Sequence, residues 1–193
     1  MLFRSEDAVA FDSSTVSSYS RYIKETRQGF NKAGDGLDTV KLLTLFDLAT
    51  HQPIAFAREP GNLADVSGIE NALKQFSFLN ISKAQIVTDK GYYSRNNIGQ
   101  MLRKHIKFLT AASIDLSWVN HRLQKNKSGL ETASSLCPWD FNIHGITVPV
   151  DAEFTYQRQR NRGEAAKGDT LSETRRLYLH LYLNRERVGD RKS

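Results

Sequence analysis

Residues 84–94 read Ala84-Gln85-Ile86-Val87-Thr88-Asp89-Lys90-Gly91-Tyr92-Tyr93-Ser94. The first half of this segment is short, apolar and rich in β-branched residues, which is typical of a buried strand. The strand is expected to end at Asp89, and Ser94 is placed to cap a helix that follows. Farther back, a second apolar run, Ala8-Val9-Ala10-Phe11, ends at Asp12. Each aspartate is therefore expected at the end of a strand.

Two further runs between these strands predict a hairpin. The mostly apolar residues 39–48 are followed, after a short break with turn-forming residues, by the apolar residues 54–57. A break of this length fits a hairpin connection. Together with residues 8–11, these runs predict three neighbouring antiparallel strands.

The periodicity then changes to that of a helix. Apolar residues recur at helical spacing after Asp65, which is placed to cap the helix: Val66, Ile69, Leu73 and Phe76. A second helix is expected after Ser94, and residues 106–111 form one more strand candidate. The order strand, strand, strand, helix, strand, helix, strand predicts a mixed α/β fold.

Composition narrows the class of protein. A chain of 193 residues can form one domain or somewhat more with a substantial core, and 39% hydrophobic and 25% charged residues are ordinary globular values. No apolar run approaches the roughly 18–20 residues of a membrane-spanning helix, and the first residues lack the pattern of a secretory leader. The single cysteine, Cys137, cannot form an internal disulfide. A cytoplasmic protein without a membrane partner is expected.

Charge is distributed unevenly along the chain. Residues 1–89 carry 9 Lys/Arg and 11 Asp/Glu, residues 90–155 carry 8 and 5, and residues 156–193 carry 10 and 5, which together give the net +6. An acidic first half and a basic tail would suit a protein that holds cations in one place and a polyanion in another. A solvated basic surface is the alternative interpretation.

The second half has a different pattern. From about Trp118 the hydrophobic pattern loosens and polar residues accumulate, which indicates a boundary. Residues 141–150 have strand composition, and residues 177–183 alternate leucine strictly with Tyr178, His180 and Tyr182, a strong strand signal. We therefore expect a first domain over residues 1–115 and a second, β-rich domain over residues 116–193.

Asp12 and Asp89 are the candidate metal ligands. If their strands are neighbours in one sheet, the two carboxylates could converge on a divalent cation, because hard ions such as Mg²⁺ prefer oxygen ligands. Carboxylate-bridged ions can activate water for phosphodiester cleavage. Alternatively, each aspartate is a turn residue at a strand end.

Four short segments carry a family resemblance: Phe11-Asp12-Ser13-Ser14-Thr15, Gly29-Phe30-Asn31-Lys32, Glu59-Pro60-Gly61-Asn62-Leu63-Ala64-Asp65 and Thr88-Asp89-Lys90-Gly91-Tyr92-Tyr93-Ser94. In order and spacing they resemble the DDE transposases of bacterial insertion sequences, most closely the IS-four-like group. The resemblance covers most of residues 8–113, and residues 175–184 are similar to the β-rich insertion that this group carries.

The resemblance implies a specific fold and activity. It implies a ribonuclease-H-like α/β core in which Asp12 and Asp89 bind Mg²⁺ or Mn²⁺, followed by the start of the β-rich insertion. The implied enzyme nicks the ends of a DNA element and transfers them to target DNA. Its implied partners are element-end and target DNA, with a homodimer in the full-length enzyme.

The sequence departs from the family pattern at the third carboxylate. The family's Glu, within a Tyr, Arg, Glu, Lys pattern, is expected beyond the insertion, and the chain is expected to be a fragment that ends before it and is inactive alone. An imitation of the pattern occurs earlier, at Tyr156, Arg160, Glu164 and Lys167. Two other interpretations stay open: a catalytically inactive DNA-binding remnant and a β-rich interaction domain.

The basic tail contains candidate nucleic-acid contacts. Arg158, Arg160 and Arg162 occupy alternate positions, so on a strand they would share one face. Such an arrangement suits contact with phosphates better than reading of bases. A surface that only increases solubility is the alternative.

Overall fold

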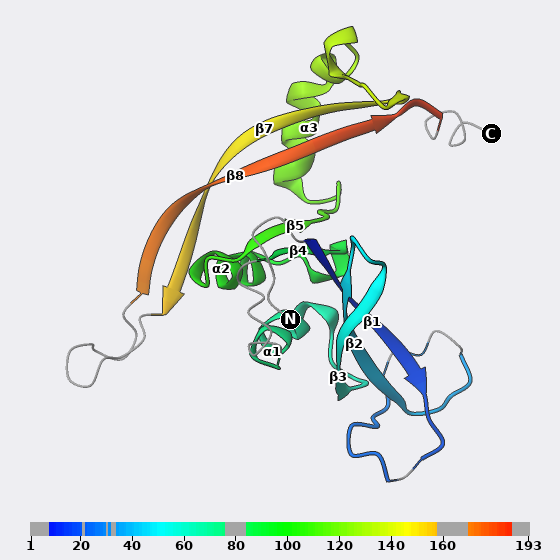
Figure 1. Ribbon diagram of the computed structural model, residues 1–193. Coiled ribbons are helices and arrows are strands. Elements are labelled where there is room, and N and C mark those ends of the chain that lie inside the picture. The colour runs from blue at the N-terminus through cyan, green and yellow to red at the C-terminus, as the bar shows by residue number, and fades with distance from the viewer. Residues whose placement is uncertain are drawn as a thin grey trace. The chain divides into compact units, whose positions relative to one another are not determined.

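The computed structural model describes residues 8–20, 22–29, 31, 34–75, 84–157 and 170–186 (Figure 1). The chain separates into two compact units, Met1–Ala112 and Ser113–Ser193. The expected domain boundary after residue 115 stays a prediction, and each unit is described by itself.

The first unit contains the expected sequence of elements. They are β1 (Ala8–Ser17), β2 (Thr39–Asp47), β3 (Gln52–Pro60), α1 (Asp65–Gln75), β4 (Gln85–Thr88), the short 3₁₀ helix η3 (Lys90–Tyr92), α2 (Arg95–Arg103) and β5 (Lys107–Thr110). Apart from η3, this is the predicted order of strands and helices.

The strands of the first unit form one mixed sheet of five strands in the order β3-β2-β1-β4-β5. β1 pairs antiparallel with β2, which pairs antiparallel with β3, whereas β4 pairs parallel with β1 and with β5. The parallel pairs need crossover connections, and α1 and α2 lie within them. This arrangement is the ribonuclease-H-like mixed sheet, so the predicted fold class is confirmed.

Alternation along the strands produces the core of this unit. Val9 and Phe11 on β1 are buried, with Leu43 and Leu45 on β2 and Ile86 on β4. Because side chains on a strand alternate between faces, these residues line one face of the sheet. The helices bury their apolar positions in turn, at Ile69, Ala72, Leu73, Ile98 and Met101.

β1 is longer than predicted. The hydroxyl-rich residues after Asp12 continue the strand, from the pair Ser13↔Leu43 to the pair Ser17↔Thr39. Backbone pairing with β2 provides hydrogen bonds that outweigh the local turn preference of the serines. Asp12 therefore lies within β1 and not at its end, which corrects the expectation.

The second unit is built around a hairpin. It contains α3 (Ser117–Leu130), the 3₁₀ helix η4 (Ala133–Ser135), β6 (Leu136–Cys137), β7 (Asp140–Gln157) and β8 (Thr170–Asn184). Its three-stranded sheet has the order β6-β7-β8 with antiparallel pairs. Figure 1 shows β7 and β8 as a long twisted ribbon.

The helices agree with the sequence to different degrees. Ser94 caps α2 as predicted, since its hydroxyl accepts a hydrogen bond from the Asn97 N–H at 3.0 Å. α3 was not predicted, because among its mostly polar residues Val119 and Leu130 alone are buried and give little periodic signal. In the described part of the chain, every helix is too short or too polar to cross a bilayer.

Candidate functional site

Asp12 and Asp89 come directly after the same pair of opposite residues on β1 and β4. Phe11 on β1 lies opposite Thr88 on β4, and this is the last pair of the parallel ladder. Asp12 is the next residue of β1 and Asp89 is the first residue after β4, and neighbouring strands lie about 4.8 Å apart. The strand adjacency on which the predicted pair depends is therefore present, while the role of the two aspartates as metal ligands stays a prediction.

Both carboxylates are exposed, and each accepts a hydrogen bond from the backbone N–H of the next residue. Asp12 Oδ1 accepts a hydrogen bond from the Ser13 N–H at 2.8 Å. Asp89 caps η3, and its Oδ1 accepts a hydrogen bond from the Lys90 N–H at 2.6 Å. These contacts orient each carboxylate and leave its second oxygen, Oδ2, as an acceptor for a cation or water.

The donor set of this pair fits a hard divalent cation. Two carboxylates are the ligands that Mg²⁺ or Mn²⁺ takes, and such ions usually keep several waters as well. Among the described residues, however, no group of three or more His, Cys, Asp or Glu side chains could hold a metal ion. Asp12 and Asp89 could therefore supply only part of a coordination shell.

Asp65, at the start of α1, links the segments that carry the two aspartates. The Ser13 hydroxyl donates a hydrogen bond to Asp65 Oδ1 at 2.9 Å, directly after Asp12. Gly91, two residues after Asp89, faces the same carboxylate, because a Cβ atom there would lie 3.3 Å from Asp65 Oδ2. Asp65 thus lies beside the residues that follow both candidate ligands, and it is hydrogen-bonded to those after Asp12.

A buried lysine holds Asp65 in place. Lys41 Nζ lies 2.6 Å from Asp65 Oδ1 and also donates a hydrogen bond to the Leu63 carbonyl. Lys41 is only 6% exposed, and Glu59, opposite it in the β2–β3 register, is 2% exposed. Burial raises the pKa of Glu59, whereas Asn71 and the Lys41 cation oppose the rise.

Sequence reasoning missed this cluster of Lys41, Glu59 and Asp65, in which Lys41 and Glu59 are buried and Asp65 is partly exposed. It assigned Asp65 only as a helix cap and gave no role to the other two. Charged residues at inward positions of otherwise apolar strands are the signal that could have found them, because buried charges are normally paired.

Tyr92 is a buried residue near Asp12 and this cluster. It is 2% exposed, and its ring packs edge-on against Phe11 with 4.9 Å between centroids. Burial raises the pKa of Tyr92 well above its usual range, and the carboxylates of Asp65, Asp12 and Glu59 add to the rise, whereas Ser13 opposes it. The phenol is therefore a neutral group near Asp12.

Replacing Glu59 by Gln is expected to stabilise the protein at neutral pH. Burial raises the pKa of Glu59 in the folded state, so the folded protein holds the Glu59 proton more tightly than the unfolded chain does. The protonated carboxyl group therefore contributes stability that is complete below its ordinary pKa of 4.5 and is lost as pH rises through the folded pKa. The stability gain of Glu59→Gln should therefore grow from acid to neutral pH, as measured by urea unfolding at several pH values. A loss of stability that deepens with rising pH would show that the paired Glu59 carboxylate stabilises the fold.

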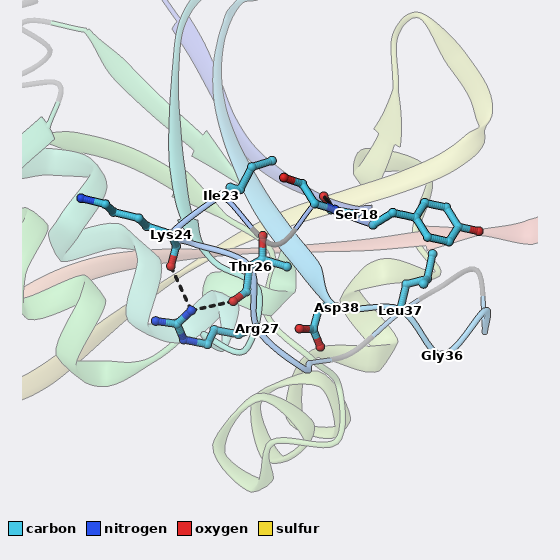
Figure 2. Close-up of a pocket in the computed structure, with 10 residues that line it drawn as sticks. Ser18, Ile23, Lys24, Thr26, Arg27, Gly36, Leu37 and Asp38 are labelled. Atoms are coloured by element: carbon cyan, nitrogen blue, oxygen red, sulfur yellow. Dashed lines mark hydrogen bonds between the residues drawn. The ribbon is translucent and has the colours of Figure 1, made fainter.

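A polar hollow lies in the loop between β1 and β2 (Figure 2). Its lining comes from residues 18–38, and neither Asp12 nor Asp89 contributes. Arg27 holds this loop together, since its guanidinium donates to the carbonyls of Lys24 at 2.9 Å and Thr26 at 2.6 Å. This cation is therefore used for loop structure.

The remaining predicted residues lie where no geometry can be stated. Arg158, Arg160 and Arg162 fall outside the described residues, as do Glu164 and Lys167. β7 ends at Gln157, directly before the three arginines. Their nucleic-acid contacts stay a prediction.

The sheet topology places the protein in the ribonuclease-H-like class, with two aspartates at adjacent strands. Within this class, the chain belongs to the transposase DDE domain family, whose model matches residues 4–186. The family resemblance is thereby confirmed, whereas the IS-four-like group and the fragment stay predictions. A comparison with curated proteins gives no match.

Two solved structures with some similarity contain viral proteins. One is the HTLV-2 integrase catalytic core domain in complex with magnesium, in a dimeric form, with 13% identity, a TM-score of 0.37 and coverage of 67% of this chain and 72% of that chain. Another is the simian T-cell lymphotropic virus intasome in complex with the PP2A regulatory subunit B56 gamma, with 14% identity, a TM-score of 0.37 and coverage of 68% and 45%.

Proposed function

We propose that this chain is part of a DNA transposase of an insertion sequence, with Asp12 and Asp89 as metal ligands. The proposed reaction nicks the end of the DNA element and joins that end to target DNA. Element ends and target DNA are the proposed partners.

One observation carries this proposal. In a member of the transposase DDE domain family, β1 and β4 are parallel neighbours, and Asp12 and Asp89 are the first residues after their last common pair. Both carboxylates are exposed, so a cation and a DNA phosphate could reach them. A turn role alone would not require the two strands to be adjacent.

The chain's own residues have distinct parts in this site. Asp12 and Asp89 would hold Mg²⁺ or Mn²⁺, which when bound supplies activation of water and neutralisation of phosphate charge. The backbone contacts at Ser13 and Lys90 orient the two carboxylates. Asp65 accepts a hydrogen bond from the Ser13 hydroxyl, so it would hold the residue that follows Asp12 in place.

The substitutions Asp12→Asn and Asp89→Asn are expected to weaken Mn²⁺ binding at least about tenfold each. Even the loss of a group that only supports a metal ligand costs roughly 10–100-fold in affinity, and a lost ligand costs no less. Mn²⁺ binding to the purified chain can be measured by electron paramagnetic resonance of the free ion.

Asp115→Asn is the matched control, because Asp115 is an exposed aspartate in the second unit. It removes the same charge and should leave Mn²⁺ affinity unchanged. Wild-type protein that binds Mn²⁺ no better than the two aspartate variants would overturn the metal site and the proposed function with it.

A catalytically inactive DNA-binding remnant is the second candidate function. The DNA that flanks the gene separates the two candidates. Terminal inverted repeats together with a reading frame that resumes after Ser193 would support the enzyme, and random flanks would support the remnant.

A further inference from the structure

The centre of β8 is a palindrome. Its residues read Leu177-Tyr178-Leu179-His180-Leu181-Tyr182-Leu183, the same in both directions from His180. Among the described residues β8 is an edge strand, because β7 pairs with one of its sides and no described strand pairs with the other. The backbone N–H and C=O groups on the outer side of an edge strand are a template for another strand.

This segment lacks the features that usually protect an edge strand. Between Leu177 and Leu183 there is no lysine, proline or glycine, and the register with β7 runs from Ile143↔Asn184 to Gln157↔Thr170 without a bulge. Charges, prolines and bulges are the common means of blocking edge pairing. Leucine and tyrosine side chains also favour strand pairing.

Side chains on both faces of β8 are accessible to a partner strand. Tyr178 and Tyr182 are 64% and 67% exposed. On the other face, Leu177, Leu179 and Leu183 are only partly buried, whereas Leu181 is buried. Adding a strand beside β8 would therefore bury apolar surface as well as satisfy backbone groups.

We propose that β8 pairs antiparallel with β8 of a second copy of this chain, across a two-fold axis at His180. In this register Leu177 lies opposite the second copy's Leu183, Tyr178 opposite Tyr182, and His180 opposite His180. Directly opposite residues of antiparallel strands point to the same face, so tyrosine meets tyrosine and leucine meets leucine. The two three-stranded sheets become one continuous sheet.

The charges beside the palindrome give a smaller preference in the same direction. In the antiparallel register Arg176 faces the neutral Asn184 of the second copy, whereas Arg175 faces Arg185, which lies beyond the end of β8. In a parallel, in-register pair, Arg175, Arg176 and Arg185 would each face their own counterpart, so three like-charge contacts would form instead of two, and like charges directly opposite are unfavourable. Because β7 occupies the inner side of β8, the pairing closes at two copies and does not extend to a fibre.

Sedimentation of the full chain over a range of concentrations tests the proposal. The wild-type chain should be a dimer that dissociates on dilution. His180→Lys should weaken dimerisation at least about tenfold, because it places two ammonium groups opposite each other at the axis and such contacts cost several kcal/mol. His180→Ala should keep the dimer, since it removes the contact with Thr147 Oγ1 at 2.9 Å without adding charge.

Ser172→Lys is the matched control, because Ser172 is exposed on β8 outside the paired segment. It adds the same charge and should leave the dimer unchanged. A wild-type chain that is monomeric at every concentration would overturn the proposal. Equal weakening by His180→Lys and Ser172→Lys would also overturn it.

Cysteine pairs test the register without depending on the stability of a charged variant. Under mild oxidation His180→Cys should cross-link with itself, because opposite Cβ atoms lie near disulfide range. Tyr178→Cys should cross-link with Tyr182→Cys in a mixture but not with itself, since the two copies of residue 178 would be about 13 Å apart. Cross-linking of each single variant with itself to the same extent would contradict the palindromic register.

Discussion

Gly61→Ala is expected to destabilise the first unit by about 3 kcal/mol, near the upper end of the cost of overpacking a core. A Cβ atom at Gly61 would lie 2.1 Å from the Thr39 carbonyl oxygen and 2.3 Å from its Oγ1. Thr39 is fully buried and cannot yield, because its backbone N–H and C=O both pair with Arg27, at 2.8 and 3.0 Å. The Gly61 N–H also donates to the Glu25 carbonyl at 3.3 Å, so three chain segments meet at this glycine.

Urea unfolding measures this effect as a lower midpoint with an unchanged slope. A cost of about 3 kcal/mol corresponds to roughly a hundredfold change in the folding equilibrium. Gly129→Ala is the contrasting control, because Gly129 lies in α3 and its Cβ would make ordinary contact with Ile146 Cδ1 at 3.9 Å. Alanine in a helix stabilises by about 0.5–1 kcal/mol. Equal midpoints for the wild-type and Gly61→Ala chains would contradict the close approach.

The order of elements in the first unit could be predicted because each element carries its own periodic signal. Residues 39–48 and 84–88 are apolar over the length of a strand, and the helix after Ser94 has a cap of the expected type. Such signals are local, so they are present in the sequence before any long-range contact forms. The pairing of β1 with β4 is not local, and its expectation depended on the family resemblance.

Elements stabilised by distant contacts were missed or mistaken. Residues 13–17 have local turn preference, yet β2 provides a full ladder of partners for them. α3 has few apolar positions, so its helical period is weak in the sequence. In both cases, tertiary contacts decide what local preference leaves open.

The residues of the candidate site also differ in whether the local sequence could predict them. Asp12 and Asp89 could be proposed from sequence because each follows an apolar run. The cluster of Lys41, Glu59 and Asp65 could not, because its members come from β2, β3 and α1 and meet only in the folded chain. Buried charged residues such as Lys41 and Glu59 normally have a partner, so they are identified once the residue that pairs with each is known.

Replacing Arg158, Arg160 and Arg162 together by Ala is expected to flatten the salt dependence of DNA binding by about 2.7 units, at about 0.9 per phosphate contact. Their alternate spacing puts the three guanidinium groups on one side of any extended segment, and β7 is a strand up to the preceding Gln157. Contacts with phosphates are blind to sequence, so binding to unrelated duplexes should weaken equally. Between 50 and 200 mM salt, a slope difference of this size corresponds to about a fortyfold change in relative affinity.

Fluorescence anisotropy of a labelled duplex, titrated at several salt concentrations, measures the slope. Lys104, Lys125 and Lys127 are exposed, and their joint replacement by Ala is the matched control because it removes the same net charge elsewhere. If the arginines contact phosphates, the control should flatten the slope much less than the arginine variant. Equal flattening would mean that overall charge governs binding, and an unchanged slope in the arginine variant would assign these three residues to solubility. Either result would show that these three arginines do not make the phosphate contacts of the proposed transposase. A phosphate contact depends on a particular side chain, whereas the effect of net charge does not.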